Sequence, residues 1–153
     1  MKRFLALTLA VLAALYGLFG CAGVSEGERK LSRIGKELGI DLSAGTLVGF
    51  EDDHGGFHGD GTTYAEIDLD KPVEGLAEAP GWRPLPLSEN AERAVRLCQT
   101  EAVLPGKGFY YLYDSQSENP YDDTDLHDRY SWNFIIAVYD DQASRLYYYQ
   151  LDT

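Results

Sequence analysis

The last third of the chain carries three runs rich in apolar and aromatic residues, and in the second run Trp132, Phe134, Ile136 and Val138 recur at every second position. These runs span residues 109–114, 131–139 and 145–151. Alternation with a period of two is typical of β-strands, because successive side chains point to opposite faces of a sheet. The short connection at 140–144 fits a hairpin, whereas residues 115–129 form a long polar loop. The pattern predicts an antiparallel meander that ends close to the C-terminus.

Four further elements come before this meander. The apolar spacing predicts a helix over 28–38 and a second helix over 89–100, with Ser88 as its N-cap. Strands are predicted over 46–51 and 62–69, and the second of them shows clear alternation. On the strand at 62–69, one face carries Ala65, Ile67 and Leu69, and the other carries Tyr64, Glu66 and Asp68.

The order α-β-β-α-β-β-β predicts a single α+β domain over residues 28–153. We expect an antiparallel sheet of about five strands with two helices packed on one face. The proline-rich stretch at 70–88 is expected to be a loop in which Trp82 folds back over the core. Apolar residues make up 44% of the chain and aromatic residues 12%. That content excludes a disordered acidic tail.

The N-terminus has the composition of a secretory signal peptide. Lys2 and Arg3 precede an uncharged apolar run at 4–19, and Cys21 follows that run. The run is shorter than the roughly 20 residues that a membrane-spanning helix needs. We therefore expect a signal peptide over 1–20, and a short tether over 21–27 before the folded domain.

Leu18, Gly20 and Cys21 resemble the lipobox of bacterial lipoproteins. This resemblance implies that Cys21 is lipidated and that the domain is extracytoplasmic, anchored to the bacterial cell membrane. In the mature part, the stretches at 54–61, 85–90, 119–134 and 146–153 resemble a group of small bacterial lipoproteins. This resemblance implies a location and a size, and no activity.

The chain is strongly acidic, and its charged residues are unevenly distributed. The formal net charge is −12, and residues 38–153 contain seven cations against 22 anions. This balance argues against nucleic acid as a partner and favours a basic protein or a cell-envelope component. Residues 26–37 are slightly basic, which suits either an anionic bilayer surface or a solvated helix face.

The turn between the first two predicted strands is rich in glycine, histidine and aspartate. His54, His58 and Asp60 offer ligand atoms for a divalent metal, but the glycines deny the two histidines a helical arrangement. Phe57 is flanked by glycine and histidine at the tip. Three interpretations remain open: a flexible turn, a metal site and a recognition loop that presents Phe57 to a partner.

The loop at 121–128 is a second candidate for metal binding. Asp123, Asp125 and Asp128 resemble part of a calcium loop, although the glycine and the distal glutamate of an EF-hand are missing. The alternative is a solvated acidic loop. If this loop met the first one at the same end of the sheet, His127 would join His54 and His58.

The tyrosines and Cys98 complete the candidate residues. Alternation places Tyr147 and Tyr149 on one face of the last strand and Tyr148 on the other. They favour either cross-strand packing or a partner surface, with Tyr147 and Tyr149 as contacts. Cys98 lies in the second predicted helix and is expected to be a buried apolar residue.

Catalytic motifs such as a nucleophile elbow, a P-loop or a metalloprotease helix are absent from the sequence. We therefore favour a membrane-anchored binding or accessory lipoprotein without a cofactor over an enzyme. The alternative is a metal-binding protein or a metal-dependent envelope enzyme. It would use a divalent metal held by His54, His58, Asp60 and His127.

Overall fold

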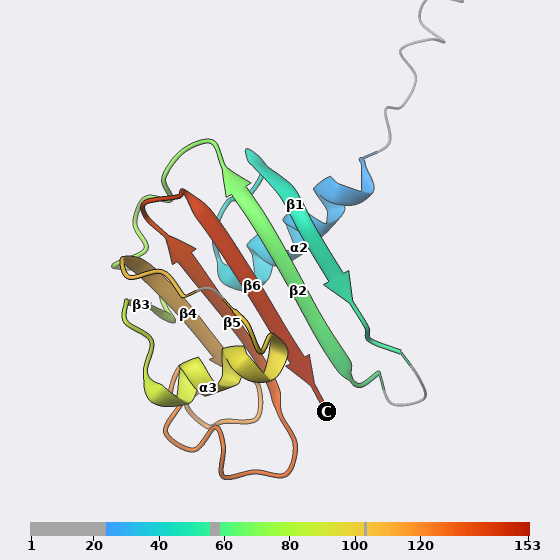
Figure 1. Ribbon diagram of the computed structural model, residues 1–153, viewed down its shortest axis with the longest axis vertical. Helices are drawn as coiled ribbons and strands as arrows, with labels where there is room; N and C mark the ends of the chain where they lie inside the picture. Colours follow the sequence, from blue (N-terminus) through green and yellow to red (C-terminus); the bar gives the residue numbers. More distant parts are fainter. Residues whose placement is uncertain (1–23, 56–58, 103) are drawn as a thin grey trace, which may run out of the picture.

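The described part of the chain contains two helices and six strands (Figure 1). The computed structural model describes residues 24–55, 59–102 and 104–153. The predicted signal peptide, Cys21, Phe57 and His58 lie outside these ranges. In chain order the elements are α2 (Glu26–Leu38), β1 (Gly45–Asp52), β2 (Gly61–Leu69), β3 (Trp82–Pro84), α3 (Glu89–Cys98), β4 (Gly108–Asp114), β5 (Asn133–Asp140) and β6 (Arg145–Asp152).

All six strands belong to one antiparallel sheet with the order β1-β2-β6-β5-β4-β3. The last strand of the chain, β6, therefore lies in the middle, between β2 and β5. The predicted α+β class, the two helices and the five longer strands are confirmed. The sixth strand, β3, is only three residues long and lies in the stretch that was expected to be a loop.

Trp82 explains why the chain pairs at β3. Its side chain is buried, and its indole nitrogen donates a hydrogen bond of 3.1 Å to the carbonyl oxygen of Leu38. Its ring also packs on Tyr111 of β4, with 5.5 Å between the ring centroids. Pro84 closes the strand, as expected for an edge position where no backbone donor is required.

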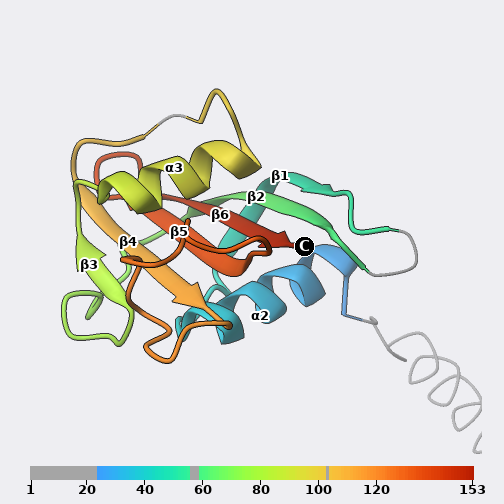
Figure 2. The same cartoon turned by 90° about the horizontal axis from the view of Figure 1, so that it is seen from below.

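The two helices cover opposite faces of the sheet, so the prediction that both pack on one face is wrong (Figure 2). Leu31, Ile34 and Leu38 of α2 pack on one face, and Ala91, Ala94 and Val95 of α3 pack on the other. The physical reason is that β5 and β6 carry large apolar side chains on both faces. Leu146 and Tyr148 lie beneath α2, whereas Tyr149 and Leu151 lie beneath α3.

Local capping explains where α2 begins and ends. The Ser25 hydroxyl accepts a hydrogen bond from the Glu28 amide, and the Glu28 carboxylate accepts one from the Ser25 amide. This capping box starts the helix two residues earlier than its apolar spacing predicts. Gly39 ends the helix with a positive φ of 69°. Neither helix in the described ranges is long and apolar enough to cross a membrane.

Candidate functional site

Three of the four residues suggested as metal ligands, His54, Asp60 and His127, are described by the structure, and they do not form one group. His54 lies just beyond β1, whereas His127 Nε2 lies 2.9 Å from the carbonyl oxygen of Asn90 on α3. Asp60 is exposed, and His58 lies outside the described residues. Among the residues described, no three His, Cys, Asp or Glu side chains are arranged to hold a metal ion.

His54 lies between two carboxylates that belong to different strands. Its Nδ1 lies 2.8 Å from Asp52 Oδ1 on β1, and its Nε2 lies 2.9 Å from Asp152 Oδ2 on β6. A carboxylate oxygen can only accept a hydrogen bond, so both contacts are hydrogen bonds only when both ring nitrogens are protonated. The geometry is therefore that of an imidazolium ion bridging the first hairpin and the last strand.

The charges around His54 support this assignment. Partial burial disfavours its charged form, but hydrogen bonds with Asp52 and Asp152 outweigh that effect and raise the pKa of His54 above its ordinary value. Burial works against the ionised form of Asp52 too. The contact with His54 nevertheless lowers the pKa of Asp52. The bridge is thus strongest when the histidine is protonated and both carboxylates are ionised.

Hydrogen bonds continue from this bridge along β6 to α2. The Gln150 amide donates to Asp152 Oδ2 at 2.6 Å, and the Tyr148 hydroxyl lies 2.9 Å from Gln150 Oε1. The same hydroxyl lies 2.6 Å from Glu37 Oε2, and because it carries one proton it donates to only one of these two oxygens at a time. Burial and then the Glu37 carboxylate raise the pKa of Tyr148, which keeps the hydroxyl protonated. These side chains therefore tie α2, β6 and the first hairpin together.

The acidic loop between β4 and β5 uses one of its aspartates to hold the protein together. Asp123 is buried, and its carboxylate accepts a hydrogen bond from the hydroxyl of Ser88, the N-cap of α3. The Asn90 side-chain amide donates to the Asp123 carbonyl oxygen at 2.9 Å. Asp125 and Asp128 are exposed. Of the three aspartates in the predicted calcium-like pattern, Asp125 and Asp128 thus face solvent, whereas Asp123 fastens the loop to α3.

A second buried aspartate anchors the other end of this loop. Asp114 is fully buried at the end of β4 and forms an ion pair with Arg129. Its Oδ1 also accepts a hydrogen bond of 3.0 Å from the Gln116 amide. The contact with Asp114 outweighs desolvation and raises the pKa of Arg129 further. This pair acts as a structural clamp, and sequence spacing alone did not single out either residue.

The two tyrosines suggested as partner contacts differ in exposure. Tyr149 is buried beneath α3, so its predicted role as an exposed contact is wrong. Its ring packs against Tyr64, with the two centroids 5.4 Å apart. Tyr147 is only partly buried, on the same face of β6. Cross-strand packing thus accounts for Tyr149, while Tyr147 is available at the surface.

One region of the sheet on the α3 side is left uncovered. In Figure 1, α3 crosses the lower part of β4–β6 and does not reach over β1. Tyr64, Glu66 and Asp68 lie on this face of β2, as the alternation predicts. We call this region the open sheet surface; its residues are Val48, Gly49, Glu51, Tyr64, Glu66, Asp68, Arg145 and Tyr147.

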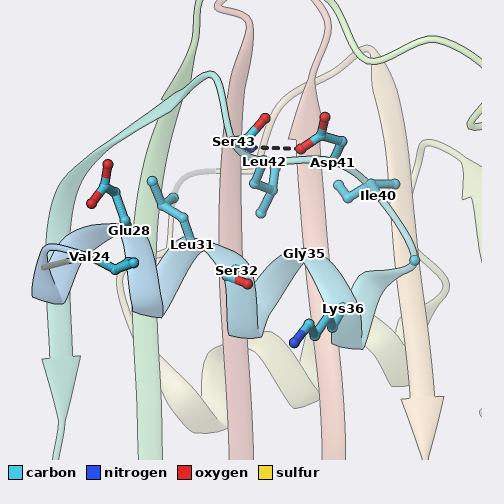
Figure 3. A pocket seen from close by; sticks show the side chains of 11 residues that line it. Val24, Glu28, Leu31, Ser32, Gly35, Lys36, Ile40, Asp41, Leu42 and Ser43 are labelled. Atoms are coloured by element: carbon cyan, nitrogen blue, oxygen red, sulfur yellow. Dashed lines mark hydrogen bonds between the residues drawn. The ribbon is translucent and has the colours of Figure 1, made fainter. Parts of the chain in front are cut away.

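An apolar groove lies on the opposite side of the sheet, between α2 and the loop that follows it (Figure 3). It measures about 730 Å³, and Leu31, Gly35 and Leu42 are among the residues that line it. Gly35 is required here, because a Cβ atom would lie 2.7 Å from the carbonyl oxygen of Ile40. Val24, three residues after Cys21, lies at the same groove.

Internal ion pairs use most of the cations between residues 38 and 153. Arg83, Arg96, Arg129 and Arg145 each lie within 4 Å of a carboxylate. Arg145 alone contacts both Glu66 and Asp68. Lys71, Arg93 and Lys107 are the remaining cations in this part of the chain. Because few cations remain to balance the other carboxylates, the surface of the domain is acidic.

Cys98 lies at the end of α3, mostly buried against the core on that side. Burial raises the pKa of the Cys98 thiol to about 12. A thiol with such a pKa is almost entirely protonated near neutral pH and is a poor nucleophile. The prediction of a buried structural cysteine therefore agrees with its surroundings.

Comparison of the chain with protein-family models, curated proteins and solved structures found no match. The resemblance to bacterial lipoproteins stays a prediction from the residues quoted above.

Proposed function

We propose that this chain is a membrane-anchored, extracytoplasmic binding or accessory lipoprotein. A lipid on Cys21 holds it to the bacterial cell membrane, and its acidic domain binds a basic protein or another basic component of the cell envelope. The signal-like run at 4–19 and the cysteine that follows it support the location. An anchor on Cys21 would lie only a few residues before α2 begins at Glu26.

The observation that carries the binding role is the internal use of the cations. Four arginines between residues 38 and 153 are paired with carboxylates of the same chain, among them the buried Asp114 and Asp123. Exposed carboxylates such as Glu51, Glu118 and Asp125 have no lysine or arginine of the described residues within 4 Å. A surface of this kind attracts cationic partners and repels anionic ones.

The anchor is tested by labelling cells with a fatty-acid analogue. The wild-type chain should carry the label and sediment with membranes, whereas the Cys21→Ser variant should carry no label. Signal-peptide cleavage by mass spectrometry serves as the control, because lipidation predicts a mature chain that begins at residue 21. An unlabelled wild-type chain would rule out the anchor.

Partner binding is tested by capture from a detergent-solubilised envelope extract with the full chain as bait. We expect a cationic component that is retained at about 50 mM salt and released at about 300 mM, because screening weakens attraction between surface charges. Retention that persists at high salt would contradict the acidic binding role. Retention that disappears with a chelator would favour the metal role of His54, His58, Asp60 and His127.

A further inference from the structure

We infer that the partner contributes an extended, lysine- or arginine-rich segment that pairs with the open edge of β1 and lies against the open sheet surface. This inference rests on the proposed function and names the surface and the form of the partner. It is argued from the hydrogen-bonding direction of β1, from the uncovered side chains beside it and from their charge.

The strand β1 lies at one edge of the sheet, and half of its backbone groups point away from β2. The Leu69 amide donates to the carbonyl oxygen of Ser144 at 2.9 Å, so the backbone groups of Leu69 point toward β6. By alternation, the backbone N–H and C=O groups of Ile67 and Ala65 also point toward β6. The backbone groups of their partners on β1, Leu47 and Phe50, therefore point away from β2. This row of donors and acceptors is a template for one further strand.

The side chains beside this edge leave room for a partner. A bulge between Leu47 and Gly49 turns Val48 outward, and 49% of its surface is exposed. Gly49 presents no side chain; a Cβ atom there would lie 3.4 Å from the Cβ of Glu66. Tyr64 is partly exposed. The surface next to the edge thus combines an apolar residue, a bare stretch of backbone and an aromatic ring.

The charge of this surface indicates the chemistry of the partner. Glu51 and Asp53 are exposed acidic residues at the end of β1, whereas Asp52 between them is already paired with His54. Arg145 is the cation of this surface, and it is engaged by Glu66 and Asp68. Burial and then the Glu66 carboxylate raise the pKa of Tyr64 to about 12, which keeps its hydroxyl protonated as a donor.

A basic strand therefore satisfies the open edge and the acidic side chains together. A second copy of this chain is a poorer occupant, because each copy carries a formal net charge of −12. Lys30 of α2 lies on the other face of the sheet, against Phe50. Its ammonium group lies 3.9 Å from the centroid of the Phe50 ring.

The experiment uses fluorescence anisotropy with the full chain in detergent and a labelled twelve-residue peptide of alternating lysine and threonine. We expect saturable binding that Glu51→Lys weakens about tenfold, since an attractive charge becomes repulsive. The matched control is Glu118→Lys, an identical charge change in the exposed loop between β4 and β5. It should change the affinity less than about twofold. Circular dichroism verifies that both variants are folded.

A second peptide separates strand pairing from charge attraction alone. It has the same sequence with N-methyl groups on alternate residues, so it keeps every charge but loses the donors along one edge. We expect its affinity to fall at least about tenfold. Equal binding of the two peptides, or equal effects of Glu51→Lys and Glu118→Lys, would overturn the inference.

Two further outcomes keep this inference distinguishable from the proposed function. If the peptide does not bind but the envelope extract still yields a salt-sensitive partner, the inferred surface is wrong and the proposed function stands. If sedimentation shows a dimer that Val48→Lys disrupts, the edge belongs to a second copy of the chain and the inference is overturned.

Discussion

The Tyr148 hydroxyl lies 2.6 Å from the Glu37 carboxylate, although 111 residues separate the two along the chain. This contact joins the first helix of the domain to the central strand of the sheet. Tyr148 is fully buried, so its hydroxyl has no access to water in compensation. A helix at the start of the domain and a strand at its end are thus fastened by one polar contact inside an apolar layer.

Removing that hydroxyl should lower the stability of the domain. We expect Tyr148→Phe to reduce the free energy of unfolding by about 1–3 kcal/mol, because a partly buried charged acceptor loses its donor. Urea denaturation followed by fluorescence measures the change. Tyr113→Phe is the control, since that hydroxyl makes no side-chain hydrogen bond among the described residues and should change stability by less than about 0.5 kcal/mol.

The His54 bridge should make stability depend on pH in a defined direction. The folded-state pKa of His54 is raised, so its contribution is fully present below the ordinary value of about 6.5 and is lost as pH rises through the folded value. His54→Gln should therefore cost about 1 kcal/mol at pH 5.5 and clearly less at pH 9. An equal cost at both pH values would contradict the bridge. His127→Gln serves for comparison, because its Nε2 meets a backbone carbonyl rather than a carboxylate.

The ion pair between Asp114 and Arg129 should matter more than the exposed charges nearby. Asp114→Asn keeps the size of the side chain but leaves the partly buried guanidinium without its counter-charge. We expect a loss of about 2–4 kcal/mol, measured by thermal denaturation. Asp128→Asn changes an exposed residue of the same loop and should be nearly neutral. Equal effects of the two variants would show that the pair does not anchor the loop.

Gly108 tests how closely β4 approaches β5. Its φ is 133°, and a Cβ atom there would lie 1.9 Å from the carbonyl oxygen of Tyr139. Gly108→Ala should therefore destabilise the domain by about 3 kcal/mol or more, because the clash is with backbone. At Gly106 a Cβ atom would meet nothing within 4 Å. Gly106→Ala should thus leave the melting temperature almost unchanged, and a similar loss in both variants would contradict this assignment.

The alternation of residues was sufficient to predict five strands and the face that Tyr64, Glu66 and Asp68 share. The helical spacing of apolar residues was sufficient for the two helices within about two residues. Neither pattern could predict the short strand β3, because its three residues, which end with Pro84, are too few to show a period. The strand forms because the Trp82 side chain contacts Leu38 and Tyr111, which are distant in the sequence.

The error over the helix faces has a cause that is visible in β6. Leu146 and Tyr148 alternate with Tyr147 and Tyr149, so both faces of this strand are apolar and both need a cover. The prediction left the face that carries Tyr147 and Tyr149 without a helix, and therefore expected Tyr149 to be exposed, whereas it is buried. The partners of His54 were missed for another reason: Asp152 is 98 residues away, and only the register of the sheet brings the two together.

The central position of β6 also has a consequence for how the chain folds during synthesis. Because β6 pairs with both β2 and β5, the first hairpin and the C-terminal strands have no common sheet until residues 145–152 have emerged. Sheets that depend on such distant pairings form slowly. If the chain is exported unfolded, as the proposed function requires, the whole sheet can form only after residues 145–152 have crossed the membrane.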